Sequence, residues 1–346
     1  MKHQTTRYGE IPFYKIGTFG NTADAFISKK LFLEYKTKYS FPKKGDILIS
    51  ASGTIGRAVI YDGKPAYFQD SNIVWIDNDE TLVKNDFLFY AYSNVKWNTE
   101  HTTILRLYND NFRNTLIPLP PLNEQNAIAN ILSALDRYLY ALDALILKKE
   151  GVKKSLSFEL LSQRKRLKGF NQAWQRVRLG DIANYLISNL SAEQITQQGK
   201  IKVYDVNNFI GYTDTTFISD KPYISIVKDG SVGRVRILPP KTNILSTMGA
   251  LIANHRTTTE FLFYLLSNFD FKNFTSGSII PHIYFKDYKE KTIFLPPLNE
   301  QIAIADILSA LDNEIASLKN KKRQFENIKK ALNHDLMSAK IRVLKK

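Results

Sequence analysis

The side chains in this sequence with the clearest capacity for chemistry are two arginines, each at the end of a short glycine pattern. The pattern GTIGR occupies residues 53–57 and GSVGR residues 230–234, and each follows an apolar, β-like run. Neither copy has the Lys-Ser/Thr ending of a nucleotide P-loop, and neither fits the dinucleotide-binding pattern. Glycines commonly form tight turns, and arginine donates hydrogen bonds to phosphates and guanine edges. We therefore predict two turns that present Arg57 and Arg234 to a nucleic acid.

Further polar side chains with the right donors and acceptors for base edges occur in β-like or loop segments of both halves. Besides the two arginines, the predicted DNA-binding residues are Ser71, Asn72, Thr102, Arg106, Lys228, Asn254, His255, Arg256, Ser276 and His282. Taken alone, each of them fits an ordinary solvent-exposed position better than a base contact. Only the set as a whole predicts a binding surface.

The motifs of DNA-modifying enzymes are absent from the sequence. Amino-methyltransferases need an Asn/Asp-Pro-Pro-aromatic stretch for the flipped base, but the pairs beginning at Pro120, Pro239 and Pro296 follow leucine and precede Leu or Lys. There is no Gly-rich cofactor loop or helicase P-loop, and five scattered histidines without cysteine predict no metal site. We expect no catalytic residue and no bound cofactor. The alternative is a single-chain methyltransferase or nuclease with divergent motifs, which an assay of methyl transfer by the purified chain would reveal.

A segment of eighteen residues occurs twice. LPPLNEQNAIANILSALD at 119–136 returns as LPPLNEQIAIADILSALD at 295–312, with sixteen identical positions. Asn123 predicts a helix N-cap, and Glu124 places a negative charge where the helix dipole favours it. Apolar residues then alternate at spacings of four and three, as in a coiled coil. These predicted seam residues are Ile128, Leu132, Leu135, Leu139 and Leu142 in the first copy and Ile304, Leu308, Leu311, Ile315 and Leu318 in the second. Each helix would be roughly 60 Å long at 1.5 Å per residue.

The segments before the two helices are fainter copies of each other. DFLFY at 86–90 resembles EFLFY at 260–264, and the glycine patterns recur in the same order. We therefore predict an α+β chain with a pseudo-two-fold internal repeat, made of a first α/β domain (1–121), a long helix (122–168), a second α/β domain (169–297) and a second long helix (298–346). If the second domain is compact, the helices run antiparallel and the domains lie at opposite ends of a rod. Similar helices predict a shared task, whereas divergent domains predict two different targets.

The net charge of +15 is concentrated in two stretches. Residues 148–168 hold eight basic and two acidic residues, and residues 319–346 hold ten basic and two acidic ones. A basic protein usually has a polyanionic partner, but such runs are equally often solvated helix faces. A coiled-coil scaffold without a DNA role is therefore a further alternative, and salt-dependent duplex binding would exclude it. No apolar run predicts a membrane span, no export signal is evident, and the lack of cysteine fits a cytoplasmic protein.

With these features together, the sequence resembles the specificity subunit of type I restriction–modification systems. The resemblance rests on LPPL-x-EQ opening a long helix twice, at residues 119 and 295, after two dissimilar domains. It covers nearly the whole chain. The segment from Trp174 to LGDI at residues 179–182 is similar to the family's usual entry into a target-recognition domain.

The resemblance implies a function within a larger complex. Each domain would read one half of a bipartite double-stranded DNA target, and the helices would hold two methyltransferase subunits. Restriction (translocase) subunits would join that complex, and S-adenosylmethionine, ATP and Mg would be bound by the partner subunits rather than by this chain. The half-sites would differ because the two domains differ.

One departure from the repeat concerns the first domain. Gly199 lies 25 residues after Trp174, whereas its counterpart Gly9 lies eight residues after Met1. We therefore expect the first domain to lack a stretch equivalent to about residues 174–190.

Overall fold

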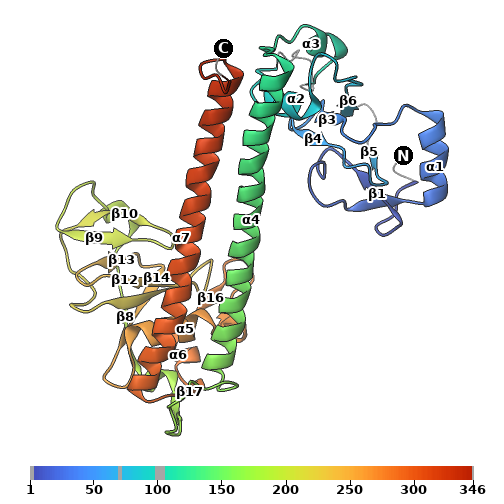
Figure 1. Ribbon diagram of the computed structural model, residues 1–346. Coiled ribbons are helices and arrows are strands. Elements are labelled where there is room, and N and C mark those ends of the chain that lie inside the picture. Colours follow the sequence, from blue (N-terminus) through green and yellow to red (C-terminus); the bar gives the residue numbers. More distant parts are fainter. Residues whose placement is uncertain (1–3, 69–71, 98–105, 345–346) are drawn as a thin grey trace. The chain divides into compact units, whose positions relative to one another are not determined.

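The computed structural model describes residues 4–68, 72–97 and 106–344. The chain forms two compact units (Figure 1): unit 1 consists of residues 1–143 and 320–346, and unit 2 of residues 144–319. The long helices α4 (Leu122–Leu161) and α7 (Leu298–Met337) each contribute one half to each unit. Each unit therefore contains a globular part and two half-helices. The α+β class and the internal repeat predicted from the sequence are confirmed.

Each long helix has 40 residues, as the seam predicted, but its ends differ slightly from the prediction. Helix α4 begins at Leu122, so Asn123 lies inside the first turn, where its side chain accepts a hydrogen bond from the backbone N–H of Glu124 at 3.0 Å. The helices stop before residues 168 and 346. Just beyond their ends, Gln163 and Ala339 have φ angles of +62° and +56°. A left-handed residue at this place is a common way to end a helix.

In unit 1 the two half-helices are antiparallel. Lys322 of α7 forms an ion pair with Asp143 of α4 at 2.7 Å, and Lys329, further along α7, forms one with the earlier residue Asp136. The two helices therefore run in opposite directions. The hydroxyl of Tyr90 also donates to Asp136, at 2.8 Å. Burial and this hydrogen bond raise the pKa of Tyr90, so the hydroxyl stays protonated and keeps donating. The cluster fastens the globular part to both half-helices.

Unit 2 repeats this arrangement with residues at corresponding positions. Lys153 forms an ion pair with Asp312, Lys149 forms one with Glu314 at 2.8 Å, and the Tyr264 hydroxyl donates to Asp312 at 2.9 Å. The ammonium of Lys153 also lies 5.7 Å from the ring centroid of Tyr264. Several lysines of the two basic runs are therefore used to pair the helices. The high charge of these runs is partly a structural property and not solely a DNA-binding signal.

The glutamate and glutamine of the repeat explain why LPPLNEQ is needed twice. In unit 2 the buried Glu300 accepts hydrogen bonds from Arg166 at 2.6 Å and from the Trp174 indole at 2.9 Å. The side chain of Gln301 accepts from the backbone N–H of Thr258 at 3.1 Å, where helix α5 (Thr259–Ser267) begins. Buried polar groups need such partners. The motif thus fixes the start of the helix onto the globular part of the same unit.

Unit 1 uses the first copy of the motif in the same way. Glu124 accepts from Arg342 at 2.7 Å and from the backbone N–H of Val343 at 3.3 Å, while Gln125 accepts from the backbone N–H of Lys84 at 2.8 Å. The hydrogen bond from the Arg342 guanidinium lowers the pKa of Glu124. Much of the identity between the two helix starts is therefore accounted for by contacts within the chain.

The seam residues differ in how deeply they are buried. Leu132 and Leu308 are fully buried, because each packs against the globular part of its unit as well as against the other half-helix. Leu135 and Leu311, one turn further on, are only half-buried. Leu160 and Leu336, near the ends of the helices, are buried in the same two clusters, so each helix is packed most deeply where it meets a globular part.

Unit 2 contains three sheets and helix α5 (Thr259–Ser267), which packs on the four-stranded sheet. Its strands and its remaining short helix are β7 (Gln175–Arg178), β8 (Ala183–Ile187), β9 (Ile201–Tyr204), β10 (Phe209–Thr213), β11 (Tyr223–Val227), β12 (Val235–Leu238), β13 (Asn243–Ile244), β14 (Met248–Ala253), β15 (Thr275–Ser276), β16 (His282–Ile283), α6 (Phe285–Tyr288) and β17 (Thr292–Leu295). The sheet orders are β12-β11-β14-β8, β10-β9-β13 and β17-β7, and β15 and β16 form a separate hairpin. Strands of this kind are short because turns and glycines interrupt each apolar run.

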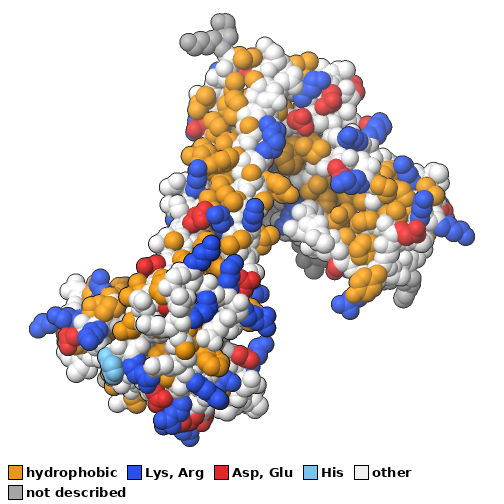
Figure 2. All heavy atoms as spheres, turned by 60° about the horizontal axis from the view of Figure 1, so that its bottom comes forward, with side chains coloured by type: hydrophobic (Ala, Val, Ile, Leu, Met, Phe, Trp, Pro, Cys, Tyr) orange, Lys and Arg blue, Asp and Glu red, His pale blue; other side chains and the backbone are white. Residues whose placement is uncertain are grey.

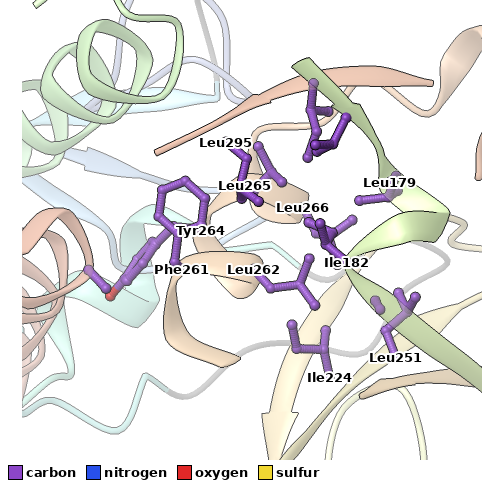
Figure 3. Packing of buried hydrophobic residues seen from close by; sticks show 14 of the residues in the cluster. Leu179, Ile182, Ile224, Leu251, Phe261, Leu262, Tyr264, Leu265, Leu266 and Leu295 are labelled. Atoms are coloured by element: carbon purple, nitrogen blue, oxygen red, sulfur yellow. The ribbon is translucent and has the colours of Figure 1, made fainter. Parts of the chain in front are cut away.

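The main core of unit 2 forms between α5 and the four-stranded sheet. Figure 3 shows Leu262 and Leu266 of α5 facing Ile182 and Leu251, with Leu265 beside Leu295. The apolar residues of α5 lie on several sides of the helix. This is because the four-stranded sheet, the two half-helices and the segment after β7 all cover it. This core positions the loops that leave β11 and β16.

The described residues of unit 1 form a smaller version of the same plan. Its elements are β1 (Ile11–Tyr14), β2 (Ala25–Ile27), α1 (Lys29–Lys38), β3 (Ile47–Ser50), β4 (Ala58–Ile60), β5 (Tyr67–Phe68), β6 (Ile73–Trp75), α2 (Asn85–Tyr92) and α3 (Asn109–Arg113). The sheets β2-β1-β5 and β4-β3-β6 match β10-β9-β13 and β12-β11-β14 strand for strand. Among these residues nothing corresponds to β7 or β8.

The glycine patterns form tight turns, as predicted, between β3 and β4 and between β11 and β12. Both glycines of each turn have positive φ, +81° at Gly230 and at Gly233. A Cβ at Gly233 would lie 2.6 Å from Cδ2 of Phe271, whereas a Cβ at Gly230 would meet nothing within 4 Å. The two positions therefore share one backbone requirement and differ in packing.

We expect Gly230→Ala to cost about 1–2 kcal/mol of unfolding free energy through the left-handed backbone alone. Gly233→Ala should cost roughly 1–3 kcal/mol more, because it adds overpacking against Phe271. Urea unfolding of both variants measures the difference. Equal losses would show that the Phe271 ring moves aside freely.

Candidate nucleic-acid interface

In unit 2 the turn after β11 is joined to the β15–β16 hairpin by backbone hydrogen bonds. Gly230 N–H donates to the carbonyl of Pro281 at 2.9 Å, and Ile283 N–H donates to the carbonyl of Lys228 at 2.9 Å. The half-buried Lys228 thus lies between the sheet and the hairpin. The arrangement holds two polar loops side by side at one end of the sheet.

His282 is at the centre of this pair of loops. Its Nδ1 lies 2.6 Å from Oδ1 of Asp229, and it pairs with the exposed Ser276 across the hairpin. The imidazole stacks on Tyr284 with ring centroids 6.4 Å apart, and the ammonium of Lys286 lies 5.4 Å from the same tyrosine ring. With the proton on Nδ1, Nε2 is an acceptor. The cluster therefore combines an acceptor, a cation and an aromatic face that is half exposed, which are groups suited to base edges and phosphates.

Unit 1 has the same backbone framework with other side chains. Leu107 N–H donates to the carbonyl of Ala51 at 2.8 Å, and Ser52 forms a β-bridge with Arg106. The guanidinium of Arg106 lies 6.0 Å from the ring centroid of Tyr108, which is 41% exposed. An arginine and a tyrosine thus occupy the place where unit 2 has a histidine and a tyrosine.

The correspondence between the two clusters follows the register of the long helices. His282 and Tyr284 lie 176 residues after Arg106 and Tyr108, and the long-helix repeat has the same offset. The sequence prediction named Arg106 and His282 separately but missed both tyrosines, Asp229 and Lys286. A comparison of residues 176 positions apart in the segments before the helices pairs Tyr108 with Tyr284, and would have identified both tyrosines.

The arginines of the glycine patterns have different surroundings. Arg57 is half-buried and its Nη1 donates to the carbonyl of Phe19 at 2.9 Å, so it also braces unit 1 from within. Arg234 is exposed. Asn72 accepts a hydrogen bond from Ser52 at 2.8 Å and so joins the unit 1 cluster. Two further predicted residues, Ser71 and Thr102, lie outside the described residues.

Asn254, His255 and Arg256 lie at the other end of strand β14 from the His282 cluster. Asn254 donates to the carbonyl of Asp181 at 2.9 Å, and Arg256 donates to the side chain of Gln175 at 3.1 Å. His255 is exposed. The structure therefore does not bring these three predicted residues together with Lys228, Ser276 and His282, and two of them fasten β7 and the segment after it.

In the view of Figure 2, Lys and Arg side chains are more numerous than acidic ones over the globular parts. Among residues 4–68, 72–97 and 106–344, no group of three or more His, Asp or Glu side chains could hold a metal ion. The described helices include none that is long and apolar enough to cross a membrane.

The repeated fold and the paired polar clusters define an internally duplicated protein with one polar cluster in each unit. The family model "Type I restriction modification DNA specificity domain" matches residues 1–149 and 171–327. The chain belongs to this type I restriction–modification specificity family, and the resemblance predicted from the sequence is confirmed. Members of this family are non-catalytic specificity subunits, so neither the single-chain enzyme nor the scaffold is supported.

Individual relatives agree with this assignment. A putative type I restriction enzyme specificity subunit of Haemophilus influenzae is 63% identical over 137 residues, which are 39% of this chain and 36% of that protein's length. The putative type I restriction enzyme MjaX specificity subunit of Methanocaldococcus jannaschii is 29% identical over 335 residues, covering 86% of this chain and 79% of that protein. The crystal structure of a type I restriction–modification S subunit from M. genitalium covers 97% of this chain and 91% of its own, with a TM-score of 0.64 at 21% identity, a likeness of fold.

Proposed function

We propose that this chain reads a bipartite duplex DNA target, with one half-site for each unit. The observation that carries the proposal is the pair of equivalent β-bridges, Ser52 with Arg106 and Asp229 with His282. One backbone framework with different side chains is suited to two different base sequences. The arginine in unit 1 favours a guanine edge, whereas the histidine acceptor in unit 2 favours an exocyclic amine.

Catalysis belongs to partner subunits in this proposal, in the cytoplasm. Two methyltransferase subunits bind one chain and supply the S-adenosylmethionine site, and restriction subunits with ATP and Mg join them. Support comes from repeat positions that internal packing does not explain. Leu122 and Leu298 are identical in the two copies and are 39% and 45% exposed, and Ala134 and Ala310 are also exposed. A surface presented twice fits two copies of one partner.

We expect a complex saturated with methyltransferase to contain two methyltransferase subunits for each specificity chain. The physical reason is the duplication of the exposed apolar positions at both helix starts. Native mass spectrometry of the purified complex gives the ratio directly. A ratio of one at saturation would contradict the two-site model.

We expect His282→Ala and Arg106→Ala to weaken DNA binding by the assembled complex at separate half-sites. Each substitution should cost about 1–3 kcal/mol, or roughly tenfold to a hundredfold in affinity. His282→Ala should relax base preference in one half-site only, and Arg106→Ala in the other. Binding to a panel of duplexes, each altered at one base pair and measured at fixed salt, separates the two effects.

His255→Ala is the matched comparison for His282→Ala, because both are unit 2 histidines but they lie at opposite ends of β14. We expect binding by His255→Ala to stay within about twofold of the parent, a change below 0.5 kcal/mol. If His255→Ala relaxed base preference while His282→Ala did not, the other end of the sheet would be the DNA-reading surface.

A further inference from the structure

Leu116 and Leu119 of unit 1 are exposed, whereas Leu295, the counterpart of Leu119 in unit 2, is buried. Leu116 is 94% exposed and Leu119 is 43% exposed. The counterpart of Leu119 in the repeat is Leu295, which is 4% exposed. Within the described part of the chain, no strand pairs with residues 116–119.

In unit 2 these counterparts form strand β17, which is covered by strand β7. The register places Ile293 opposite Val177 and Leu295 opposite Gln175. Trp174, Val177 and Leu179, at the start, middle and end of that covering segment, all belong to the main core of unit 2. The second unit therefore shows which kind of polypeptide buries this surface.

Unit 1 has a hollow of about 520 Å³ beside the exposed segment. Its walls include Ala91 and Asn94 at the end of α2, Leu116 and Ile117, and Met337 at the end of α7. All of these belong to unit 1. The counterparts of Ala91 and Ile117 in the repeat are Leu265 and Ile293, which lie in the same core cluster as Val177. The hollow thus corresponds to the place where the covering segment packs.

The backbone of residues 116–119 is compatible with an added strand despite Pro118. In unit 2 Leu179 N–H donates to the carbonyl of Lys291 at 3.0 Å, and hydrogen-bonded pairs alternate in an antiparallel ladder. Ile293 and Val177 are therefore a hydrogen-bonded pair, and Phe294, the counterpart of Pro118, is not. A proline there removes no ladder donor, and the N–H groups of Ile117 and Leu119 face the incoming strand.

We propose that residues 116–119 and the adjoining hollow form a docking site for an extended segment of a partner polypeptide. The segment carries a tryptophan followed by apolar residues three and five positions later, the spacing of Trp174, Val177 and Leu179. It adds to unit 1 as an antiparallel strand, a common mode of peptide recognition. Its indole N–H donates to Glu124, as Trp174 does to Glu300, and replaces the long hydrogen bond from Val343. The inference rests on the internal repeat and is independent of DNA recognition.

A fluorescent peptide with the sequence of residues 173–183 tests the proposal on the 346-residue chain. We expect saturable binding of one peptide per chain by fluorescence anisotropy. Amide hydrogen exchange of residues 116–119 should slow on binding, while residues 292–295, already covered by β7, should not change.

Modified peptides provide controls that leave the protein untouched. N-methylation at Val177 removes an N–H that would donate to Ile117 and should abolish binding, whereas N-methylation at Arg176, on the non-bonded side, should change affinity less than about threefold. Trp174→Ala in the peptide should weaken binding at least about tenfold, since buried aromatic anchors dominate such interfaces.

Three results would overturn the proposal. The first is no binding of the parent peptide to a chain whose exchange pattern shows unit 1 folded. The second is slowed exchange confined to unit 2. The third is protection of residues 116–119 without peptide in a chain that sediments as a dimer, because a second copy would then be the occupant.

Discussion

Exchanging residues 174–294 for the same segment of another specificity protein should change one half of the methylated DNA motif and leave the other half unchanged. The exchanged segment lies wholly within unit 2 and contains the His282 cluster. Unit 1 keeps its own cluster around Arg106. Sequencing of methylated DNA from cells that express the chimaera with its methyltransferase gives the motif.

The donor segment has to preserve the contacts that fasten it to the helices. These contacts include the Trp174 indole on Glu300 and the Tyr264 hydroxyl on Asp312. A donor with tryptophan and tyrosine at these places is the informative chimaera, and one lacking both is the control for misfolding. A folded chimaera in which both halves of the motif change would refute the assignment of one half-site to each unit.

Leu308→Asp should unfold unit 2. Leu308 is fully buried in the core cluster with Phe261 and Leu266, and an ionised carboxylate there has no partner. Burial of such a charge costs several kcal/mol, on the order of the whole stability of a domain. Hydrogen exchange of residues 144–319 should approach the unfolded rate.

Leu311→Asp is the matched control on the same helix. Leu311 is a seam residue too, but it is only half-buried, so its carboxylate can reach water. The loss should be about 1–2 kcal/mol, and unit 2 should stay folded. The sequence alone treats the two positions as equivalent. A loss for Leu311→Asp as large as that for Leu308→Asp would show that the outer seam is more tightly packed than its exposure indicates.

The long helices were predictable because a periodic pattern sustained over forty residues is specific to one structure. The turns at Gly53 and Gly230 were predictable for a similar reason, since two glycines three residues apart between apolar runs leave few alternatives. In each case the information lies within a short stretch of sequence.

The candidate site was predicted only in part because it depends on long-range pairing. Nothing near Ser276 or His282 in the sequence shows that Asp229, about fifty residues earlier, lies beside them. The polar composition of residues 254–256 likewise does not show at which end of β14 they lie. Register and sheet order decide both questions.

The division of the chain between the units has a consequence for the order of folding. Unit 2 is continuous in sequence, whereas unit 1 needs residues 320–346 as well as residues 1–143. During synthesis, unit 2 can fold before the last part of unit 1 exists. In unit 2, Glu150 of α4 and Lys319 of α7 form an ion pair. This ion pair brings together the two helix segments that continue into unit 1. Without a folded unit 2, unit 1 would have to close a long loop made of residues 144–319. With unit 2 already folded, the loop to be closed is effectively short, and its entropy cost is smaller.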